Sequence, residues 1–374
     1  MIPYGRQDIS EGDIDAVTAV LRSDWLTQGP AIERFEKDVA QYCGAKHAVA
    51  TSSATAALHI ACLASGLAKG DTLWTSPNTF VASGNCALYC DAAVDFVDID
   101  PETGNMSVSE LEKKLEKRVP EVVVPVHFAG QCCEMEKIAR LSKQYGFKLI
   151  EDASHAVGGK YKGVPIGSCA FSDMTVFSFH PVKIVTTGEG GMVLTNSEDL
   201  YQKLVRLRSH GITRNPAFME KNDGPWYYEQ IELGYNYRMT DIQAALGSIQ
   251  MTRLDEFVKK RHVLAQRYDE MLSGLPLSRL KLIQDAYSSC HLYVVKIDSA
   301  KRRGVFETLR QMDIGVNVHY IPVHLQPYYR KMGFRHGDFP QAENYYEEAI
   351  SLPLYSSMTE SQQDSVIEAL RRAL

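Results

Sequence analysis

The sequence predicts an α/β fold: a mainly parallel sheet covered by helices on both faces, followed by a smaller C-terminal α+β domain. Short apolar runs alternate with helical patterns from residue 46 to about residue 210, which is typical of chains that build parallel sheets. A long amphipathic helix comes next, and the chain closes with a separately capped helix. Its 374 residues can bury a substantial core in two domains.

Seven runs of β-branched and apolar residues predict the strands of this sheet. They cover His47–Thr51, Thr72–Ser76, Val94–Ile99, Val122–His127, Lys148–Asp152, Thr175–Phe179 and Met192–Thr195. Helical periodicity between the strands predicts helices at Thr55–Leu67, Ser107–Lys117 and Glu134–Tyr145. Gly146 follows the last of these helices, and glycine is a common residue just past a helix C-terminus.

The region after residue 210 changes character. Residues 211–233 mix proline, glycine, charged and aromatic residues without a period, which predicts a long loop. Thr240 then caps a single predicted helix that runs from Asp241 to about Leu272.

The end of the chain predicts a second, smaller domain. Thr359 and Gln362 have the spacing of a capping box, which should open an amphipathic closing helix. We expect residues 1–250 to form the large domain, with an N-terminal arm over residues 1–25, and residues 251–374 to form the small domain.

Composition excludes several classes of function. The net charge is −6 and no Lys/Arg-rich run occurs, which argues against a nucleic-acid partner. Ala48–Ala68 carries no formal charge, but its hydroxyl groups and His59 favour a buried strand and helix over a membrane span. The acidic N-terminus lacks the apolar core of a signal peptide.

The eight cysteines show no CxxC pair or metal-ligand spacing, so we expect free thiols in a reducing cytoplasm and no metal site.

Lys183 is the residue of greatest chemical interest. It lies in Met174–Gly188, where only His180 could carry another formal charge. An amine held among apolar and hydroxyl side chains loses hydration, so its neutral, nucleophilic form becomes easier to reach. A Schiff-base lysine needs this property. The alternative interpretation is a lysine that extends to solvent.

Polar side chains gather at the C-terminal ends of the predicted strands, where open α/β sheets bind ligands. These groups are Ser53–Thr55, Pro77–Phe80, Asp152–His155 and Ser178–Lys183. If Lys183 carried an aldehyde cofactor, Asp152 could supply the anion that the ring nitrogen needs. Because side chains alternate along a strand, Glu151 and Asp152 should point to opposite faces. The alternative is a solvated acidic pair at a strand end.

A phosphate and a planar ring also have candidate partners. Ser53, Ala54 and Thr55 could bind a phosphate at a helix start, where backbone N–H groups and the helix dipole favour anions. An ordinary N-cap is the alternative interpretation. Ser178 could add a hydroxyl, or be one more serine in a strand. Phe80 could stack on the ring, although a buried core position is the commoner outcome for phenylalanine.

Other common motifs lack support. Gly188–Gly191 does not match GxGxxG, and no GxxxxGK[ST] sequence occurs. Neither HExxH nor H-x-E with PCxxC is present. Dinucleotide-binding, P-loop, zinc hydrolase and zinc deaminase functions therefore have no motif behind them.

The order of the motifs resembles that of the fold-type I, pyridoxal-phosphate-dependent nucleotide-sugar aminotransferases. The matching blocks span the chain: PYGRQDI, LTQGPAIERFE, TSSATAALHIA, TSPNTFVAS, FVDIDPETGNM, PVHFAGQ, EDASHAVG, FSFHPVK, TTGEGGMV, RSHGI, GYNYRMTDIQAALG, VHYIPVH and SLPLY. IPYGRQ, SDWLTQGP, SSAT and GPWYYEQIELGYNYR are most similar to the transaminases of pseudaminic acid biosynthesis. The resemblance implies an aspartate aminotransferase-like fold with pyridoxal 5'-phosphate as cofactor.

The resemblance also implies roles for single residues. Lys183 would form the Schiff base and move protons, and Asp152 would pair with the pyridine nitrogen. Phe80 would stack on the ring. His155, where relatives often have Gln, would touch the phenolic oxygen or the ring.

The remaining implied positions hold the phosphate and the substrates. Asn236 would reach the phosphate from the neighbouring subunit, which implies a homodimer with shared active sites, and Arg238 would receive the carboxylate of the amino donor. The phosphate would be held in its own subunit by Ala54, Thr55 and Ser178. The sugar-nucleotide pocket would be lined by Tyr4, Asp24, Trp25, Leu26, Thr27, His319, Tyr320, Ile321 and Pro322.

The implied activity is transamination at C4 of a UDP-linked 4-keto-6-deoxy-N-acetylhexosamine, with L-glutamate as amino donor, in the cytoplasm. The product would feed a cell-surface or flagellar glycan. Two alternatives stay open: a transaminase for another keto nucleotide sugar, and a catalytically silent sensor or scaffold with the same fold.

Two positions bear on the comparison with the family. Many relatives have Ser-Gly-Thr where this chain has Ser53-Ala54-Thr55, and alanine fits only if the backbone does not require a positive φ there. Some relatives that act as sugar dehydrases have His in place of the lysine. Lys183 is present here, which favours transamination.

Overall fold

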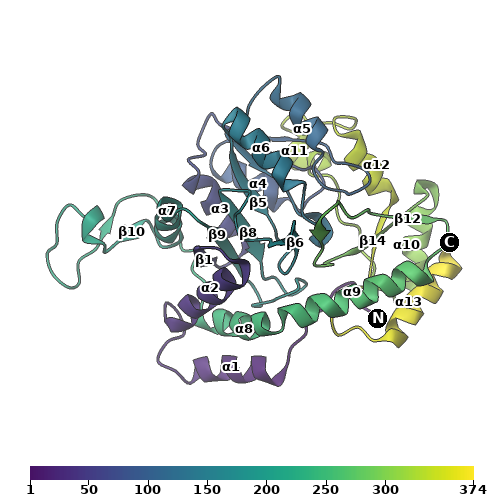
Figure 1. The fold of residues 1–374 in the computed structure, drawn as a ribbon, viewed down its shortest axis with the longest axis horizontal. Coiled ribbons are helices and arrows are strands. Elements are labelled where there is room, and N and C mark those ends of the chain that lie inside the picture. The colour runs from purple at the N-terminus through teal and green to yellow at the C-terminus, as the bar shows by residue number, and fades with distance from the viewer.

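A computed structural model describes residues 1–374, and its centre is a seven-stranded sheet with helices on both faces (Figure 1). The strand order is β1 (His47–Thr51), β9 (Gly191–Thr195), β8 (Met174–Ser178), β5 (Lys148–Asp152), β4 (Val122–Val124), β2 (Thr72–Thr75) and β3 (Ala93–Phe96). Strand β9 is antiparallel to both of its neighbours, and the other pairs are parallel. The predicted mainly parallel α/β sheet is confirmed.

Alternate residues of the strands enter two different cores. Leu73 and Ile150 belong to the core under α3 (Ala54–Ala64), α4 (Ala82–Tyr89) and α7 (Glu198–Arg208). Trp74 and Leu149 belong to the core under α2 (Pro30–Cys43), α5 (Val108–Leu115) and α6 (Met135–Tyr145). Because both faces are covered, these strands are buried along nearly their whole length, as parallel strands generally are.

Two strands end three residues earlier than predicted. Strand β3 ends at Phe96 instead of Ile99. Strand β4 ends at Val124 instead of His127, because the next residue, Pro125, has no N–H to donate to a neighbouring strand.

The single helix predicted from Asp241 to Leu272 is wrong. Two helices, α8 (Asp241–Thr252) and α9 (Leu254–Met271), meet at Arg253. The Arg253 guanidinium donates to the buried carboxylate of Asp13, in helix α1 (Glu11–Leu21), and to the carbonyl of Asp8. The junction is thereby tied to the N-terminal segment. Thr240 caps α8 in a capping box, as predicted.

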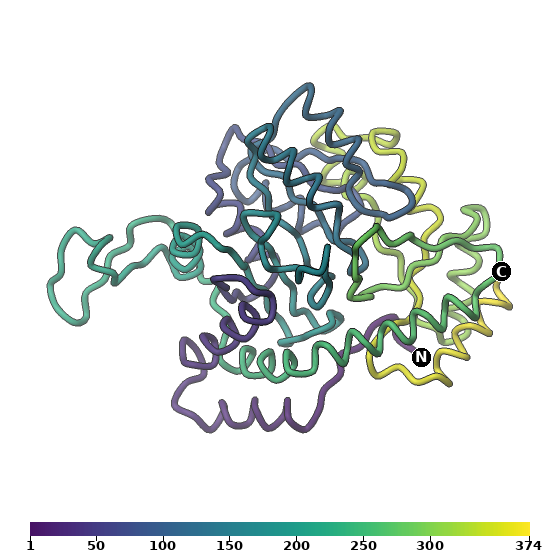
Figure 2. The backbone as a smooth tube through the Cα atoms, viewed as in Figure 1, coloured from purple at the N-terminus to yellow at the C-terminus, as the bar shows by residue number.

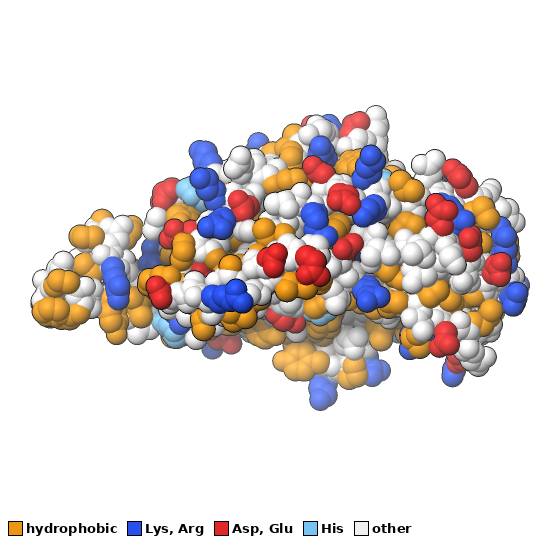
Figure 3. All heavy atoms as spheres, turned by 90° about the horizontal axis from the view of Figure 1, so that it is seen from below, with side chains coloured by type: hydrophobic (Ala, Val, Ile, Leu, Met, Phe, Trp, Pro, Cys, Tyr) orange, Lys and Arg blue, Asp and Glu red, His pale blue; other side chains and the backbone are white.

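Residues 211–233 contain more structure than the predicted loop. They include a short antiparallel pair, β10 (Ile212–Thr213) with β11 (Glu229–Gln230), and the 3-10 turn η2 (Pro216–Phe218). This segment, the projecting hairpin, extends well away from the body of the molecule (Figure 2). It exposes several large apolar side chains, and hydrophobic atoms cover much of its tip in Figure 3; these side chains are Phe218, Trp226, Tyr228, Ile231 and Leu233.

The C-terminal part has a core of its own. The three-stranded sheet β12 (Leu277–Arg279), β14 (Tyr293–Ile297), β15 (Ala349–Leu352) packs there with α9, α10 (Ser299–Gln311) and α13 (Glu360–Ala373). The capping box of Thr359 and Gln362 opens α13, as predicted. The backbone of Ile2 pairs with Ile314, so the start of the chain joins this part. The domain boundary at residue 250 stays a prediction.

The remaining elements are short. They are β6 (Lys160–Tyr161), β7 (Val164–Pro165), β13 (Ala286–Tyr287), α11 (Pro327–Arg330), α12 (Pro340–Glu348) and the 3-10 turns η1 (Phe128–Gly130) and η3 (Val323–Leu325). All eight cysteines are free, as expected, and all but Cys290 are buried. None of the helices combines the length and the apolar character needed to cross a bilayer.

Candidate active site

Asp152 and Lys183 meet at the C-terminal edge of the sheet. Asp152 is the last residue of β5, and Lys183 lies in the turn after β8, the neighbouring strand. Burial lowers the pKa of Lys183 to about 8, and the nearby Asp152 carboxylate opposes part of this shift. Lys183 as a whole is half-buried. Its amine is thus partly desolvated, and its neutral form lies within reach near neutral pH.

The Asp152 carboxylate is held in one orientation. The residue is 4% exposed. One carboxylate oxygen accepts a hydrogen bond from the Ser83 hydroxyl at 2.6 Å, and the other accepts from the hydroxyl and N–H of Ser154 at 2.6 and 3.1 Å. The alternative of a solvated acidic pair is therefore wrong, because both Glu151 and Asp152 are buried.

Three buried imidazoles lie close enough to the lysine amine to feel its charge: His155, His291 and His319. Burial is the main cause that lowers their pKa values, and the charge of Lys183 adds to it. The pKa of His319 falls to about 3. All three rings are therefore neutral at physiological pH and add no positive charge around the amine.

The segment His319–Pro322 lies beside the strand ends. The Tyr320 hydroxyl lies 3.0 Å from Nε2 of His155, and the His319 ring lies 2.8 Å from the Ser351 hydroxyl. The Tyr4 ring packs against His319, with the ring centroids 5.3 Å apart. The N-terminus and the C-terminal part of the chain thus both contribute to this site.

Phe80 is not a core residue. It is 58% exposed, and its ring centroid lies 6.4 Å from that of Tyr320. An exposed aromatic ring at the edge of the site is available to cover a planar ligand.

The candidate phosphate loop, Ser53–Thr55, is shaped by close packing. Ser53 caps α3, and its hydroxyl accepts from the N–H of Ala56 at 3.2 Å. Ala54 begins the helix without a positive φ, so alanine replaces the glycine of relatives without backbone strain. Gly191 faces Ser178 in the sheet, and a Cβ on Gly191 would lie 2.5 Å from the Ala54 nitrogen. Ser178 and the start of α3 are therefore neighbours.

Other predicted positions lie apart from Lys183 in this chain. Arg238 lines an open cavity of about 790 Å³ with Glu36 and Arg208, and Lys183 is not among the lining residues. Asn236 is exposed. The segment Asp24–Thr27 is also exposed and lies against the start of α8, where the carbonyl of Leu26 accepts the N–H of Asp241 at 3.0 Å.

Sequence reasoning gave no role of its own to three residues of this site. Ser154 lies two residues after Asp152, where serine often bonds a preceding carboxylate, so the sequence held a weak signal for it. Ser83 lies four residues after Thr79, and their hydroxyls are 2.8 Å apart, but nothing in the sequence links this pair to Asp152. His291 comes from a distant part of the chain, and only the folded structure places its ring near Lys183.

A model of the DegT/DnrJ/EryC1/StrS aminotransferase family matches residues 7–371. The chain belongs to this family. The spore coat polysaccharide biosynthesis protein SpsC of Bacillus subtilis (strain 168) is 42% identical over 377 residues, which cover 99% of this chain and 96% of SpsC. The UDP-4-amino-4,6-dideoxy-N-acetyl-beta-L-altrosamine transaminase of Campylobacter jejuni subsp. jejuni serotype O:23/36 (strain 81-176) is 39% identical, over 96% of this chain and 93% of that protein.

Solved structures agree with this assignment. Helicobacter pylori PseC, an aminotransferase involved in the biosynthesis of pseudoaminic acid, matches with a TM-score of 0.92 and 30% identity over 100% of this chain and 98% of its own. The PMP-form of the putative sugar aminotransferase Spr1654 from Streptococcus pneumoniae has a TM-score of 0.92 and 29% identity, over 100% of this chain and 99% of its own. The predicted aspartate aminotransferase-like fold, aminotransferase activity and pyridoxal 5'-phosphate cofactor are confirmed.

Proposed function

We propose that this aminotransferase moves the amino group of L-glutamate to C4 of a UDP-linked 4-keto-6-deoxy-N-acetylhexosamine. The products are UDP-4-amino-4,6-dideoxy-N-acetyl-β-L-altrosamine and 2-oxoglutarate, so one amino group and one keto oxygen exchange places. Similarity to the Campylobacter transaminase and to PseC supports this substrate, as part of pseudaminic acid biosynthesis. The observation that carries the chemistry is the desolvated Lys183 amine beside the fixed Asp152 carboxylate.

The residues at the strand ends fit pyridoxal 5'-phosphate. When bound, the cofactor supplies an aldehyde that takes up amino groups and a ring that accepts the electrons of the broken C–H bond. We infer that Lys183 binds at the aldehyde and that Asp152 keeps the ring nitrogen protonated. Phe80 covers the ring, and His155 contacts the ring or its phenolic oxygen.

The phosphate fits at the start of α3. The backbone N–H groups of Ala54 and Thr55 lie in the first turn of this helix, where the helix dipole favours an anion. Ser178 lies beside this turn and adds a hydroxyl group.

Lys183 is the proton carrier in this proposal. With a pKa of about 8, part of its amine is neutral near neutral pH, and it can take a proton from the donor carbon and return one to the sugar C4. The neutral rings of His155, His291 and His319 wall this space and exclude water without adding charge. Buried, fixed groups of this kind hold the reacting atoms in place.

We also propose a cytoplasmic homodimer with shared active sites. Asn236 is exposed, so its amide is free to reach the phosphate of a neighbouring subunit. Arg238 opens into a cavity away from the Lys183 of its own chain, which suits a carboxylate-binding role in the partner. The projecting hairpin exposes five large apolar side chains, and a second copy would bury them. Eight free thiols suit a reducing compartment.

We propose that two groups of residues line the sugar-nucleotide pocket. Tyr4 and the segment His319–Pro322 lie beside the site in one chain. The exposed segment Asp24–Thr27 would complete the pocket, and it includes Trp25, a flat surface for a base or sugar.

A transaminase for a different keto nucleotide sugar is the second candidate. SpsC is at least as similar to this chain as the Campylobacter enzyme, and its name places it in spore coat polysaccharide biosynthesis. The catalytically silent alternative does not explain why the pKa of Lys183 is lowered at this position.

One experiment separates these functions. The enzyme is loaded with pyridoxal 5'-phosphate and incubated with L-glutamate and a panel of keto nucleotide sugars that includes the two C5-epimeric UDP-4-keto-6-deoxy-N-acetylhexosamines. Products are identified by mass and NMR. We expect the L-altro amino sugar from one epimer and equimolar 2-oxoglutarate. Turnover of only another keto nucleotide sugar would support the second candidate, and no turnover of any would support the silent one. The Lys183→Ala variant is the negative control for every substrate.

A further inference from the structure

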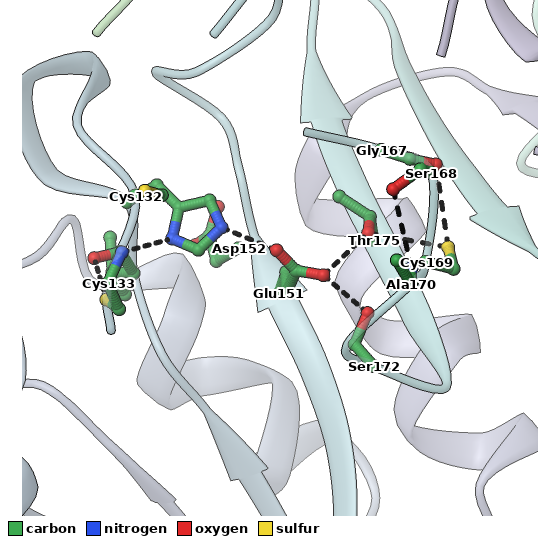
Figure 4. Close-up of polar contacts among 12 residues, drawn as sticks. Cys132, Cys133, Glu151, Asp152, Gly167, Ser168, Cys169, Ala170, Ser172 and Thr175 are labelled. Carbon is green, nitrogen blue, oxygen red and sulfur yellow. Dashed lines mark hydrogen bonds and ion pairs between the residues drawn. The ribbon is translucent and has the colours of Figure 1, made fainter. Parts of the chain in front are cut away.

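A second buried acid lies on the other side of strand β5 from the site. Glu151 precedes Asp152 and points to the opposite face, as strand alternation predicts. It is 5% exposed, and its neighbour His127 is fully buried. Figure 4 shows Glu151 at the centre of a chain of polar contacts that reaches Thr175 and Ser172 on one side. The proposed function assigns no proton transfer and no cofactor contact to Glu151.

Every hydrogen bond of this network has a defined direction. The N–H of Cys133 donates to Nδ1 of His127 at 3.2 Å, so Nε2 carries the ring proton and donates to one Glu151 oxygen at 2.7 Å. The other Glu151 oxygen accepts from the hydroxyls of Ser172 at 2.5 Å and Thr175 at 3.2 Å. A buried carboxylate with three donors is fully satisfied, and such networks fix geometry.

The network joins the strands that carry the catalytic groups. The N–H of His127 donates to the carbonyl of Asp152 at 3.0 Å, and its ring donates to the carboxylate of Glu151. His127 is therefore hydrogen-bonded to both acidic residues. Thr175 pairs with Glu151 across β5 and β8. Strand β8 continues into Ser178 and the turn that carries Lys183. The position of Asp152 relative to Lys183 is therefore connected to Glu151 through three neighbouring segments.

We propose that Glu151 and His127 are positioning residues that set the location of Asp152 against the ring nitrogen of the cofactor. They act through geometry. The network holds the backbone of β5 on the face opposite to the site, and Ser83 and Ser154 hold the Asp152 carboxylate on the face of the site. This inference rests on the proposed role of Asp152. Small displacements of catalytic groups lower reaction rates strongly. A network that fixes the position of Asp152 from the far side of β5 would therefore affect catalysis without contacting the cofactor.

Two substitutions at one position separate geometry from packing. In Glu151→Gln, the amide oxygen can accept from His127 and the amide nitrogen can donate to Ser172, so the network survives without its charge. In Glu151→Met, a side chain of similar length removes the acceptor of all three donors. The Thr175 hydroxyl keeps only its contact with Cys169 Sγ at 3.5 Å. The matched control is Asp13→Leu, which removes another buried carboxylate, the one held by Arg253 and Gln250 at the α1–α8 packing surface.

The readouts are cofactor affinity, the NMR signal of ¹⁵N-labelled pyridoxal 5'-phosphate in each holoenzyme, kcat and KM for glutamate, and thermal unfolding. We expect Glu151→Met to weaken cofactor affinity and lower kcat by ~10-fold or more, with a shifted ring-nitrogen signal and little change in KM. Glu151→Gln should stay within about threefold of the parent, and Asp13→Leu should lose stability with an unchanged ring-nitrogen signal.

Three results would overturn the inference. A normal ring-nitrogen signal in Glu151→Met, with only the stability loss that Asp13→Leu also shows, would reduce Glu151 to a packing role. A shifted signal in Asp13→Leu would show that any loss of stability moves it. Equal damage in Glu151→Gln and Glu151→Met would show that charge acts instead of geometry. Failure of the proposed function is distinct, because the parent enzyme would then not convert the UDP-4-keto sugar, whereas the ring-nitrogen signal is measured without any sugar and would still respond to Glu151→Met.

Discussion

At the scale of single residues, the proposed chemistry depends on one partly desolvated amine, that of the half-buried Lys183. Burial lowers the pKa of Lys183 to about 8 even though the Asp152 carboxylate pulls it upward. No neighbouring group adds positive charge, since the three nearby imidazoles are neutral. The fraction of neutral amine therefore grows as the pH rises toward 8 and saturates above it.

This pKa predicts how the cofactor-free enzyme takes up pyridoxal 5'-phosphate. The rate of covalent attachment should rise about ten-fold per pH unit below pH 8 and level off above it, because only the neutral amine attacks the aldehyde. Stopped-flow absorbance from pH 7 to 10 measures the profile. A midpoint near that of an exposed lysine, above pH 10, would contradict the desolvated amine.

Removal of the amine should separate binding from chemistry. Lys183→Ala should lose turnover by roughly a thousandfold or more, since both attachment and proton transfer depend on this group. The variant should still bind pyridoxamine phosphate, because the phosphate and ring partners are untouched. Product assays and fluorescence titration measure the two properties. Substantial turnover would refute the assignment.

At the scale of elements, the site is formed where strand ends and helix starts meet. Strand β9 packs against the start of α3 so closely that only glycine fits at position 191. The same contact places Ser178 beside the phosphate loop. A short distance between the backbones of β9 and α3 is thus part of the proposed phosphate site.

Gly191→Ala tests this contact. The new Cβ would lie 2.5 Å from the Ala54 nitrogen, so the loop must shift. We expect a stability loss of about 1–3 kcal/mol and a cofactor affinity lower by roughly ten-fold. Gly304→Ala, in helix α10 with open space around it, is the control and should be neutral or slightly stabilising. Equal cofactor affinity in both variants would argue against a phosphate at this loop.

Local patterns predicted the elements and much of the site, but not the long-range contacts. Asp152 was predictable because it ends an apolar strand, and Lys183 because its neighbours carry almost no charge. His291 and Ser83 were not, since only folding brings them to this edge. The break at Arg253 was also hidden, because it depends on ion pairing with Asp13 far away in the sequence.

At the scale of the whole molecule, the single chain is an incomplete catalyst in our proposal. Asn236 is exposed, Arg238 faces a cavity that Lys183 does not line, and the projecting hairpin leaves apolar side chains uncovered. A homodimer in which each chain lends these groups to its partner would account for all three features.

Mixing two inactive variants tests the shared site. A heterodimer of Lys183→Ala and Asn236→Ala chains would have one site with both defects and one site with neither. Random reassociation should therefore restore about a quarter of the parent activity. If each site were built from one chain, every site in the mixture would be defective and no activity would return. Native mass spectrometry, with an affinity tag on one of the two variants, confirms that the mixed chains exchange.

The attachment point of the cofactor tests the central claim most directly. The loaded enzyme is reduced with borohydride, digested, and its peptides are mapped by mass spectrometry. We predict one modified residue, Lys183, and no modification in the Lys183→Ala variant. A cofactor found on another lysine, or on none, would contradict the account.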